Sequence, residues 1–191
     1  MRGGERSRAT VVVSFALILF AGCATDDVYL EPNMDFGSLQ TVAVLPFQNL
    51  SNIDEAAERV RDTFTGMLLA SGAVYVLPPG EVARGIGRIS RISPEGPSTE
   101  QIKQLSNILG VEAIITGVVR EYGTMRSGST SANVVSISLQ MIETESGMVV
   151  WSASSTRGGV DIWDRLIGGG GAPMDAVTVK AIDDLLDKLF E

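Results

Sequence analysis

The chain has 191 residues, with 15 basic and 23 acidic side chains, one cysteine and no histidine. The absence of histidine excludes histidine-based catalytic triads, histidine metal sites and histidine general bases. A formal net charge of −8 disfavours binding to nucleic acid and to anionic lipid.

The first 22 residues contain the three parts of a bacterial export signal in order. Arg2, Arg6 and Arg8 form a basic start, an apolar run covers residues 11–20, and small residues follow. The apolar run is too short for a permanent transmembrane helix, which needs about twenty residues. The sequence therefore predicts a cleaved signal peptide.

Residues 20–23, Phe-Ala-Gly-Cys, resemble the lipobox of bacterial lipoproteins, with Phe20 in place of the usual leucine. In such proteins the cysteine sulfur receives a diacylglycerol, and cleavage then leaves an N-acylated cysteine as the first residue. We predict that Cys23 is the lipidation site. The alternative is an ordinary signal peptide followed by a chance cysteine. The lipid is favoured because Cys23 is the only cysteine and could form no internal disulfide.

The resemblance to lipoproteins also predicts where the protein is held. An Asp directly after the cysteine tends to retain Gram-negative lipoproteins in the inner membrane, whereas Ala24 follows here. This implies a lipid anchor in the periplasmic face of the outer membrane. Each buried methylene contributes roughly 0.8 kcal/mol, so two or three acyl chains give a practically permanent anchor. The lipid on Cys23 is covalent, and we expect no cofactor besides it.

Three segments follow from this prediction: a signal peptide (1–22), the lipidated cysteine with a short tether (23–36) and one α/β domain (37–191). Removing the signal peptide takes away three arginines and Glu5, which leaves 12 basic and 22 acidic residues. The tether shows no helical or strand period. Because it is short, we expect the domain to stay close to its membrane.

The domain begins with an apolar run at residues 41–47, which is typical of a strand covered on both faces. An amphipathic helix follows and is expected to end at Gly72. Residues 73–77 form a second apolar run, and the strand–helix–strand order predicts a parallel pair. The apolar face of the helix consists of Ala57, Val60, Phe64, Met67 and Leu68.

The middle of the domain is predicted to be helical up to a third strand. Residues 81–92 carry apolar side chains at helical spacing. Ser98 and Gln101 form a capping box that opens the next helix, and Gly110 ends it. The apolar run at 111–119 then predicts a buried strand.

The last third of the chain predicts a hairpin and a final helix. Residues 123–132 are rich in Ser, Thr and Gly and predict a mobile loop. Strands are predicted at 135–141 and 148–154, joined by a turn. A helix at 174–190 closes the chain. The predicted fold class is α/β, a mixed sheet flanked by helices in the order β-α-β-α-α-β-β-β-α.

Two features are candidate partner-binding sites. Arg84, Arg88 and Arg91 stand at i, i+4 and i+7 and would form a basic stripe that binds an acidic surface or a phosphate-bearing glycolipid. The alternative is a solvated helix face. Trp163 and Leu166 belong to an apolar patch, and aromatic anchors are enriched at interfaces. The alternative for these two residues is packing onto the sheet.

Two other features resemble ligand sites but lack a required part. The glycine run 168–171 precedes a helix, yet it is followed by Ala-Pro rather than the Lys-Ser/Thr of a nucleotide loop, and it is interpreted as a hinge. Asp183, Asp184 and Asp187 lie away from the apolar stripe of the last helix and are interpreted as solvated. We therefore predict no catalytic residue, no metal site and no small-molecule substrate.

A set of short motifs resembles the periplasmic domain of the curli-secretion lipoprotein CsgG and its relatives, over roughly residues 40–156. The group includes the penicillin-binding-protein activator LpoB and the N-terminal domain of TolB. The motifs are Val42-Ala43-Val44-Leu45-Pro46-Phe47 with Asn49 and Ser51, Ser71-Gly72, Leu109-Gly110-Val111 with Ala113 and Gly117, and Glu143-Thr144 with Ser146-Gly147, Val149 and Trp151. The resemblance implies a non-enzymatic protein that works as an oligomer or adaptor in secretion, envelope assembly or surface-appendage formation.

Two departures limit this resemblance. CsgG contributes long membrane-crossing hairpins, whereas residues 122–132 are short and polar. LpoB-type activators carry a long arm before the domain, whereas the tether here has about thirteen residues. We therefore predict a non-catalytic assembly or adaptor subunit whose partners are envelope proteins or further copies of itself. The alternatives are a secretion pore, a regulator of a cell-wall synthase and a wall hydrolase, which conductance, synthase assays and zymography would distinguish.

Overall fold

The computed structural model describes residues 28–89, 92, 96–127, 130–158 and 171–190. The strands are β1 (Val28–Leu30), β2 (Thr41–Val44), β3 (Gln48–Asn49), β4 (Tyr75–Val76), β5 (Ala113–Ser127), β6 (Thr130–Glu143) and β7 (Val149–Gly158). The helices are α2 (Ala56–Ser71), α3 (Pro79–Ile86), α4 (Thr99–Leu109) and α6 (Met174–Phe190), with a 3-10 turn η2 (Phe36–Ser38). Apart from β1, β3 and η2, this is the predicted element order, and the α/β class is confirmed.

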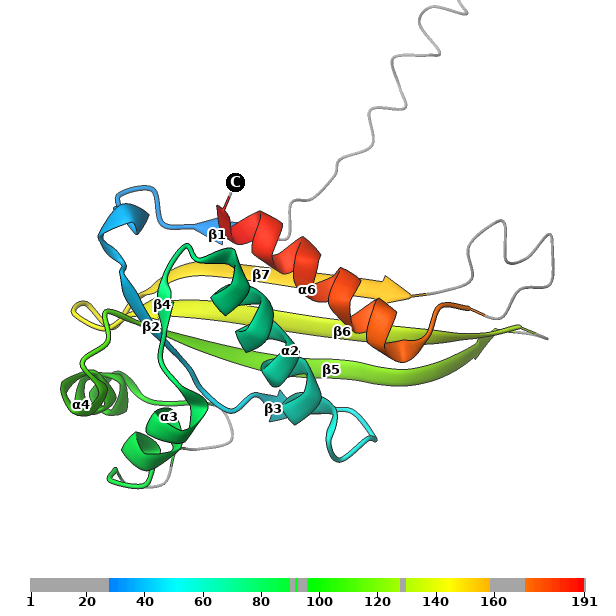
Figure 1. The fold of residues 1–191 in the computed structure, drawn as a ribbon, viewed down its shortest axis with the longest axis horizontal. Helices are drawn as coiled ribbons and strands as arrows, with labels where there is room; N and C mark the ends of the chain where they lie inside the picture. Colours follow the sequence, from blue (N-terminus) through cyan, green and yellow to red (C-terminus); the bar gives the residue numbers. More distant parts are fainter. Residues whose placement is uncertain (1–27, 90–91, 93–95, 128–129, 159–170, 191) are drawn as a thin grey trace, which may run out of the picture.

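All the described strands belong to one mixed sheet with the order β1-β7-β6-β5-β2-β4, and β3 pairs with β5 beyond β2. β2 is parallel to both β4 and β5, which confirms the predicted parallel pair. β5, β6 and β7 form an antiparallel meander. Figure 1 shows these three long strands running along the longest axis of the molecule.

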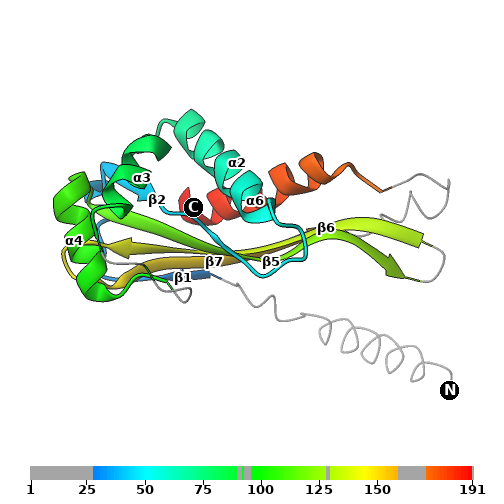
Figure 2. The ribbon, with the colours of Figure 1, turned by 90° about the horizontal axis from the view of Figure 1, so that it is seen from below.

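The two faces of the sheet carry separate cores. α2 and α6 cover one face, as both views show (Figures 1 and 2), and bury Phe64, Leu185 and Trp151 completely. On the opposite face α3 and α4 cover a smaller core that includes Ala43 and Ile114. Because side chains alternate between the faces of a strand, the apolar runs of β2 and β5 supply both cores.

The predicted helix ends are mostly confirmed. Ser98 Oγ accepts from the Gln101 amide (3.3 Å) and Gln101 Oε1 from the Ser98 amide (3.0 Å), which is the expected capping box. Gly72 and Gly110 end their helices with φ of 66° and 67°, a conformation that favours glycine. The helix predicted at 81–92 is instead α3, which ends at Ile86.

The prediction of a mobile loop at residues 123–132 is wrong. Residues 123–127 belong to β5 and residues 130–132 to β6, and the pairing of the two strands continues to Ser127 opposite Thr130. The hairpin end extends past α2 and α6 (Figures 1 and 2). Backbone pairing along the whole hairpin, together with β7 alongside β6 as far as Gly158, supplies order that the Ser/Thr/Gly composition does not reveal.

The prediction of an irregular segment before the domain is also wrong in part. Val28–Leu30 form β1, in which Val28 lies opposite Ala153 and Leu30 opposite Trp151 of β7. Phe36 packs against the main core. A three-residue strand has too few positions to show a period, so its order comes from the free edge of β7 rather than from its own sequence.

The larger core leaves no room for a side chain at Gly117. A Cβ at this position would lie 2.5 Å from Leu139 Cδ2 and 2.8 Å from Phe47 Cδ1, and both neighbours are buried. Gly117→Ala should therefore lower the free energy of unfolding by about 1–3 kcal/mol, measured by urea titration. As the control, Gly66→Ala lies in α2 with no atom within 4 Å of the new Cβ. It should raise the stability by about 0.5–1 kcal/mol, and equal effects of the two changes would contradict the packing.

Candidate functional surfaces

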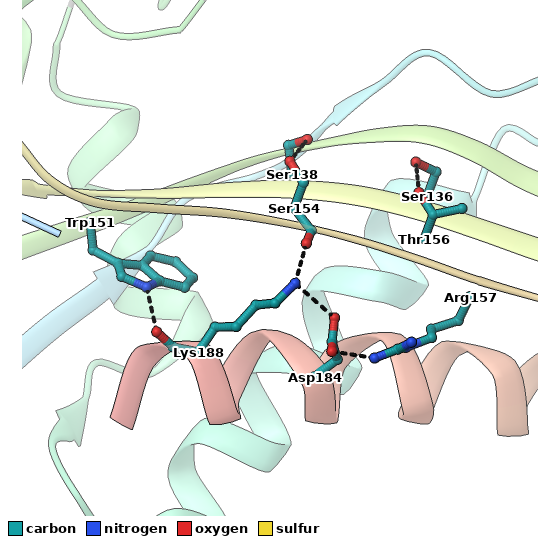
Figure 3. A network of polar contacts seen from close by, with 8 residues as sticks. All are labelled: Ser136, Ser138, Trp151, Ser154, Thr156, Arg157, Asp184 and Lys188. Atoms are coloured by element: carbon teal, nitrogen blue, oxygen red, sulfur yellow. Dashed lines mark hydrogen bonds and ion pairs between the residues drawn. The ribbon is translucent and has the colours of Figure 1, made fainter. Parts of the chain in front are cut away.

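Polar contacts tie the C-terminal half of α6 to β7 (Figure 3). The indole N–H of Trp151 donates to the backbone oxygen of Lys188 at 3.0 Å, and Lys188 Nζ donates to the backbone oxygen of Ser154 at 2.8 Å. Lys188 Nζ also lies 3.1 Å from Asp184 Oδ2, and the Arg157 guanidinium donates to Asp184 Oδ1. Because the Trp151 side chain is fully buried, its N–H needs such a partner, and α6 is held in one position on the sheet.

The interpretation of Asp184 as a solvated carboxylate is wrong. Its side chain is only 20% exposed. Partial burial by itself raises the pKa of Asp184, but hydrogen bonds from Ser155 and Lys188 and the positive charges of Lys188 and Arg157 outweigh it, so the pKa lies below its ordinary value of 3.8. Ser155 Oγ is buried beside this carboxylate. The sequence pattern missed the network because Arg157 is 27 residues away.

Asp183 and Asp187 keep the predicted exposure and line a groove between the last turns of α2 and α6. The groove has a volume of about 480 Å³. Phe190 is 49% exposed at its end. The other lining residues are Met67, Ala70, Ser71 and Leu186. Among the described residues, the lining combines apolar side chains with two carboxylates and includes no basic side chain.

The face of β6 and β7 opposite α6 carries a row of hydroxyl groups. Ser136 Oγ lies 2.9 Å from Thr156 Oγ1, and Ser138 Oγ lies 2.8 Å from Ser154 Oγ (Figure 3). Arg120 Nε donates to Ser138 Oγ at 3.0 Å. Figure 2 shows α2 and α6 on the other side of these strands. This surface is therefore polar, and its hydroxyls are paired across the strands.

A larger groove of about 840 Å³ lies beside this row, between the sheet and the segment after α3. Its apolar lining includes Ile86, Ile89 and Ile92, and its polar lining includes Arg120 and Gln140. Neither the hydroxyl row nor this groove was predicted, because each combines residues from segments far apart in the sequence.

The predicted basic stripe does not lie on one continuous helix, because α3 ends at Ile86 and not at residue 92. Arg84 lies on α3 with 72% of its side chain exposed, 3.9 Å from Glu81. Arg88 is exposed in the turn that follows, and its amide donates to the Gly85 oxygen at 3.0 Å, so it still lies about one turn beyond Arg84. Arg91 lies outside the described residues, as do Cys23, Trp163 and Leu166, and their roles stay predictions.

No group of three or more His, Cys, Asp or Glu side chains is placed to hold a metal ion in the described part of the chain. Among the helices described above, none is both long and apolar enough to cross a membrane. Of the predicted glycine hinge, residues 168–170 lie outside the described ranges.

Residues 36–190 match the family model described as "Putative lipoprotein GNA1162-like". The chain belongs to the GNA1162-like family. This supports the lipoprotein part of the sequence prediction, and the matched region starts 13 residues after Cys23. The CsgG-like assignment is not confirmed, because the matching family is a different one.

Solved structures share the fold of this GNA1162-like chain. PelC from Paraburkholderia phytofirmans, a dodecamer, is 20% identical with a TM-score of 0.57, over 84% of this chain and 96% of PelC. GNA1162 from Neisseria meningitidis is 17% identical with a TM-score of 0.56, over 79% and 98%. The C-terminal domain of LpoB from Salmonella enterica reaches only 0.47, at 12% identity over 61% and 81%, which is too low to carry an argument. No curated protein sequence matches this chain.

The network around Asp184 gives a stability prediction. Asp184→Ala removes the shared acceptor of Arg157 and Lys188, and it should lower the free energy of unfolding by about 1–2 kcal/mol in a urea titration. Glu145→Ala is the control, because Glu145 is exposed in a turn and forms no ion pair within the described residues. It should change the stability by less than about 0.5 kcal/mol.

The pH dependence of the same pair of proteins checks the cause. Because the folded pKa of Asp184 is depressed, its contribution is fully present above the unfolded pKa and is lost as the pH falls through the folded pKa. The stability difference between wild type and Asp184→Ala should be constant from neutral pH to about pH 5 and shrink in more acidic solution. A difference that grows on acidification would contradict this assignment.

Proposed function

We propose that this GNA1162-like chain is a non-catalytic subunit of an envelope assembly, export or surface-appendage system, anchored by the Cys23 lipid in the periplasmic face of the outer membrane. The observation that carries the proposal is the match of residues 36–190 to a lipoprotein family directly downstream of a lipobox-like cysteine. Ala24 after the cysteine supports the choice of the outer membrane.

The distance between anchor and sheet supports a role next to the membrane. β1 begins at Val28, five residues after Cys23, and is paired with β7. Five residues reach at most about 18 Å. The domain would therefore lie against the membrane that holds the lipid, where it could recruit or align other envelope proteins but could not reach far across the periplasm.

We propose further that copies of the chain assemble with one another. The PelC structure, which shares this fold, is a dodecamer. The chain also carries the surfaces that contacts need, namely the open hydroxyl row of β6 and β7 and the grooves on both faces of the sheet. In this proposal the contact residues are Trp163, Leu166 and the arginines of the basic stripe, Arg84, Arg88 and Arg91.

The anchor is tested by Cys23→Ala in the full-length chain. The variant should lose labelling by a palmitate analogue and accumulate as an unprocessed or soluble precursor, since it lacks the sulfur that accepts the diacylglycerol. Wild type should label and fractionate with outer membranes. Labelling that persists in the variant would contradict lipidation at Cys23, and recovery of wild type in inner membranes would contradict only the proposed location.

The contact role is tested by Trp163→Ala, with crosslinking in intact cells read by mass spectrometry. If Trp163 anchors a partner, the variant should lose crosslinks to envelope proteins while Cys23 acylation and the thermal unfolding midpoint stay at wild-type values. Glu145→Ala, an exposed change elsewhere, should keep the crosslinks. A Trp163→Ala protein with the full wild-type crosslink pattern would show that this residue is not a contact anchor.

A further inference from the structure

The groove between α2 and α6 exposes apolar surface that no other described residue covers. Met67 on α2 and Leu186 and Phe190 on α6 line it, and Phe190 is 49% exposed. Asp183 and Asp187 add two exposed carboxylates one helical turn apart. The two carboxylates give this groove a negative charge, so they favour an occupant that carries positive charge.

The net negative charge of the protein limits which surface of a second copy could bind in this groove. Without its signal peptide the chain has 12 basic and 22 acidic residues, so two copies repel each other unless a local basic surface meets a local acidic one. Arg157 is engaged by Asp184, and Arg120 by Ser138. Within the described residues, Arg84 and Arg88 are the one pair of basic side chains that lie a single helical turn apart.

Arg84 and Arg88 are available for such a contact. Arg84 is 72% exposed and has a carboxylate, that of Glu81, no nearer than 3.9 Å, a separation at which an exposed pair contributes little. Arg88 is exposed and forms no ion pair in the described part of the chain. The two arginines are four residues apart, as are Asp183 and Asp187, so both pairs span about 6 Å along their turns.

The two pairs lie on different surfaces of the molecule. The groove is formed by α2 and α6 on the main core face, whereas α3 packs with α4 against the opposite core. Figure 1 shows α6 and α3 toward opposite long sides of the sheet. A contact that joins them must therefore link two copies through unlike surfaces, and such head-to-tail contacts close into rings or extend into filaments.

From this match in charge, spacing and placement, we propose that the end of α3 of one copy docks into the α2–α6 groove of the next. Arg84 and Arg88 of one copy pair with Asp183 and Asp187 of its neighbour. The proposal rests on the self-assembly proposed above and assigns the two surfaces that produce it.

Charge reversal in the full-length, lipidated protein tests the pairing. Arg84→Glu with Arg88→Glu makes both surfaces acidic, and Asp183→Lys with Asp187→Lys makes both basic. Each double variant alone should assemble with a dissociation constant raised about tenfold or more, measured by light scattering after extraction in mild detergent. An equimolar mixture should assemble again, because each acidic surface then meets a basic one on the other variant, and the mixed assemblies should contain the two variants in alternation.

Each outcome bears on the proposal separately. Glu145→Ala, away from both surfaces, should assemble as wild type. If wild type itself is monomeric, both self-assembly and this interface are wrong. If wild type assembles and the two variants assemble equally well, or if the mixture fails to recover, the interface is wrong while self-assembly stands. Loss of a crosslink to a different envelope protein, with self-assembly unchanged, would show that the groove belongs to that protein instead.

Discussion

The packing of α6 against β7 is the interaction on which the α2–α6 groove depends. Trp151 is buried under the helix and bonded to its backbone, and Lys188 and Asp184 hold the last turns against β7. With α2 alongside, one face of the meander is closed. These contacts set the position of α6 on β7, and with it the position of Asp183 and Asp187 in the groove beside α2.

The two sides of the domain differ. Helix α6 covers one face of β6 and β7, and the hydroxyl row lies on the other face. β1 holds the start of the described chain at the edge of the sheet, five residues from the predicted lipid. A membrane-bound domain with unlike sides and an acidic total charge suits assembly by specific head-to-tail contacts, because a random encounter of two such copies is repulsive. Self-assembly would then concentrate any further contact surface in a ring or filament next to the membrane.

The sequence predicts those parts of the fold that local chemistry determines. Gly72, Gly110 and the Ser98 capping box mark helix ends through contacts with their own neighbours, and the apolar runs of β2 and β5 mark buried strands. The hairpin end was missed because backbone pairing between β5 and β6 orders it despite its polar composition, and β1 was missed because it pairs with the distant strand β7. Asp184 was misassigned because its partner Arg157 is 27 residues away, whereas Asp183 and Asp187, which lack distant partners among the described contacts, were assigned correctly.

The central claim is that the chain works through contacts between unlike surfaces of lipid-anchored copies. Its three lysines allow a direct measurement, since Lys103 lies on α4 beside α3, and Lys180 and Lys188 lie on α6. Cells that contain normal and heavy-isotope copies should be treated with a lysine crosslinker and the products read by mass spectrometry. The account predicts crosslinks between Lys103 and Lys180 that join a normal to a heavy copy. The account would be contradicted if an assembled sample lacked these crosslinks and joined normal to heavy copies only through Lys103 to Lys103 or through the lysines of α6 to each other.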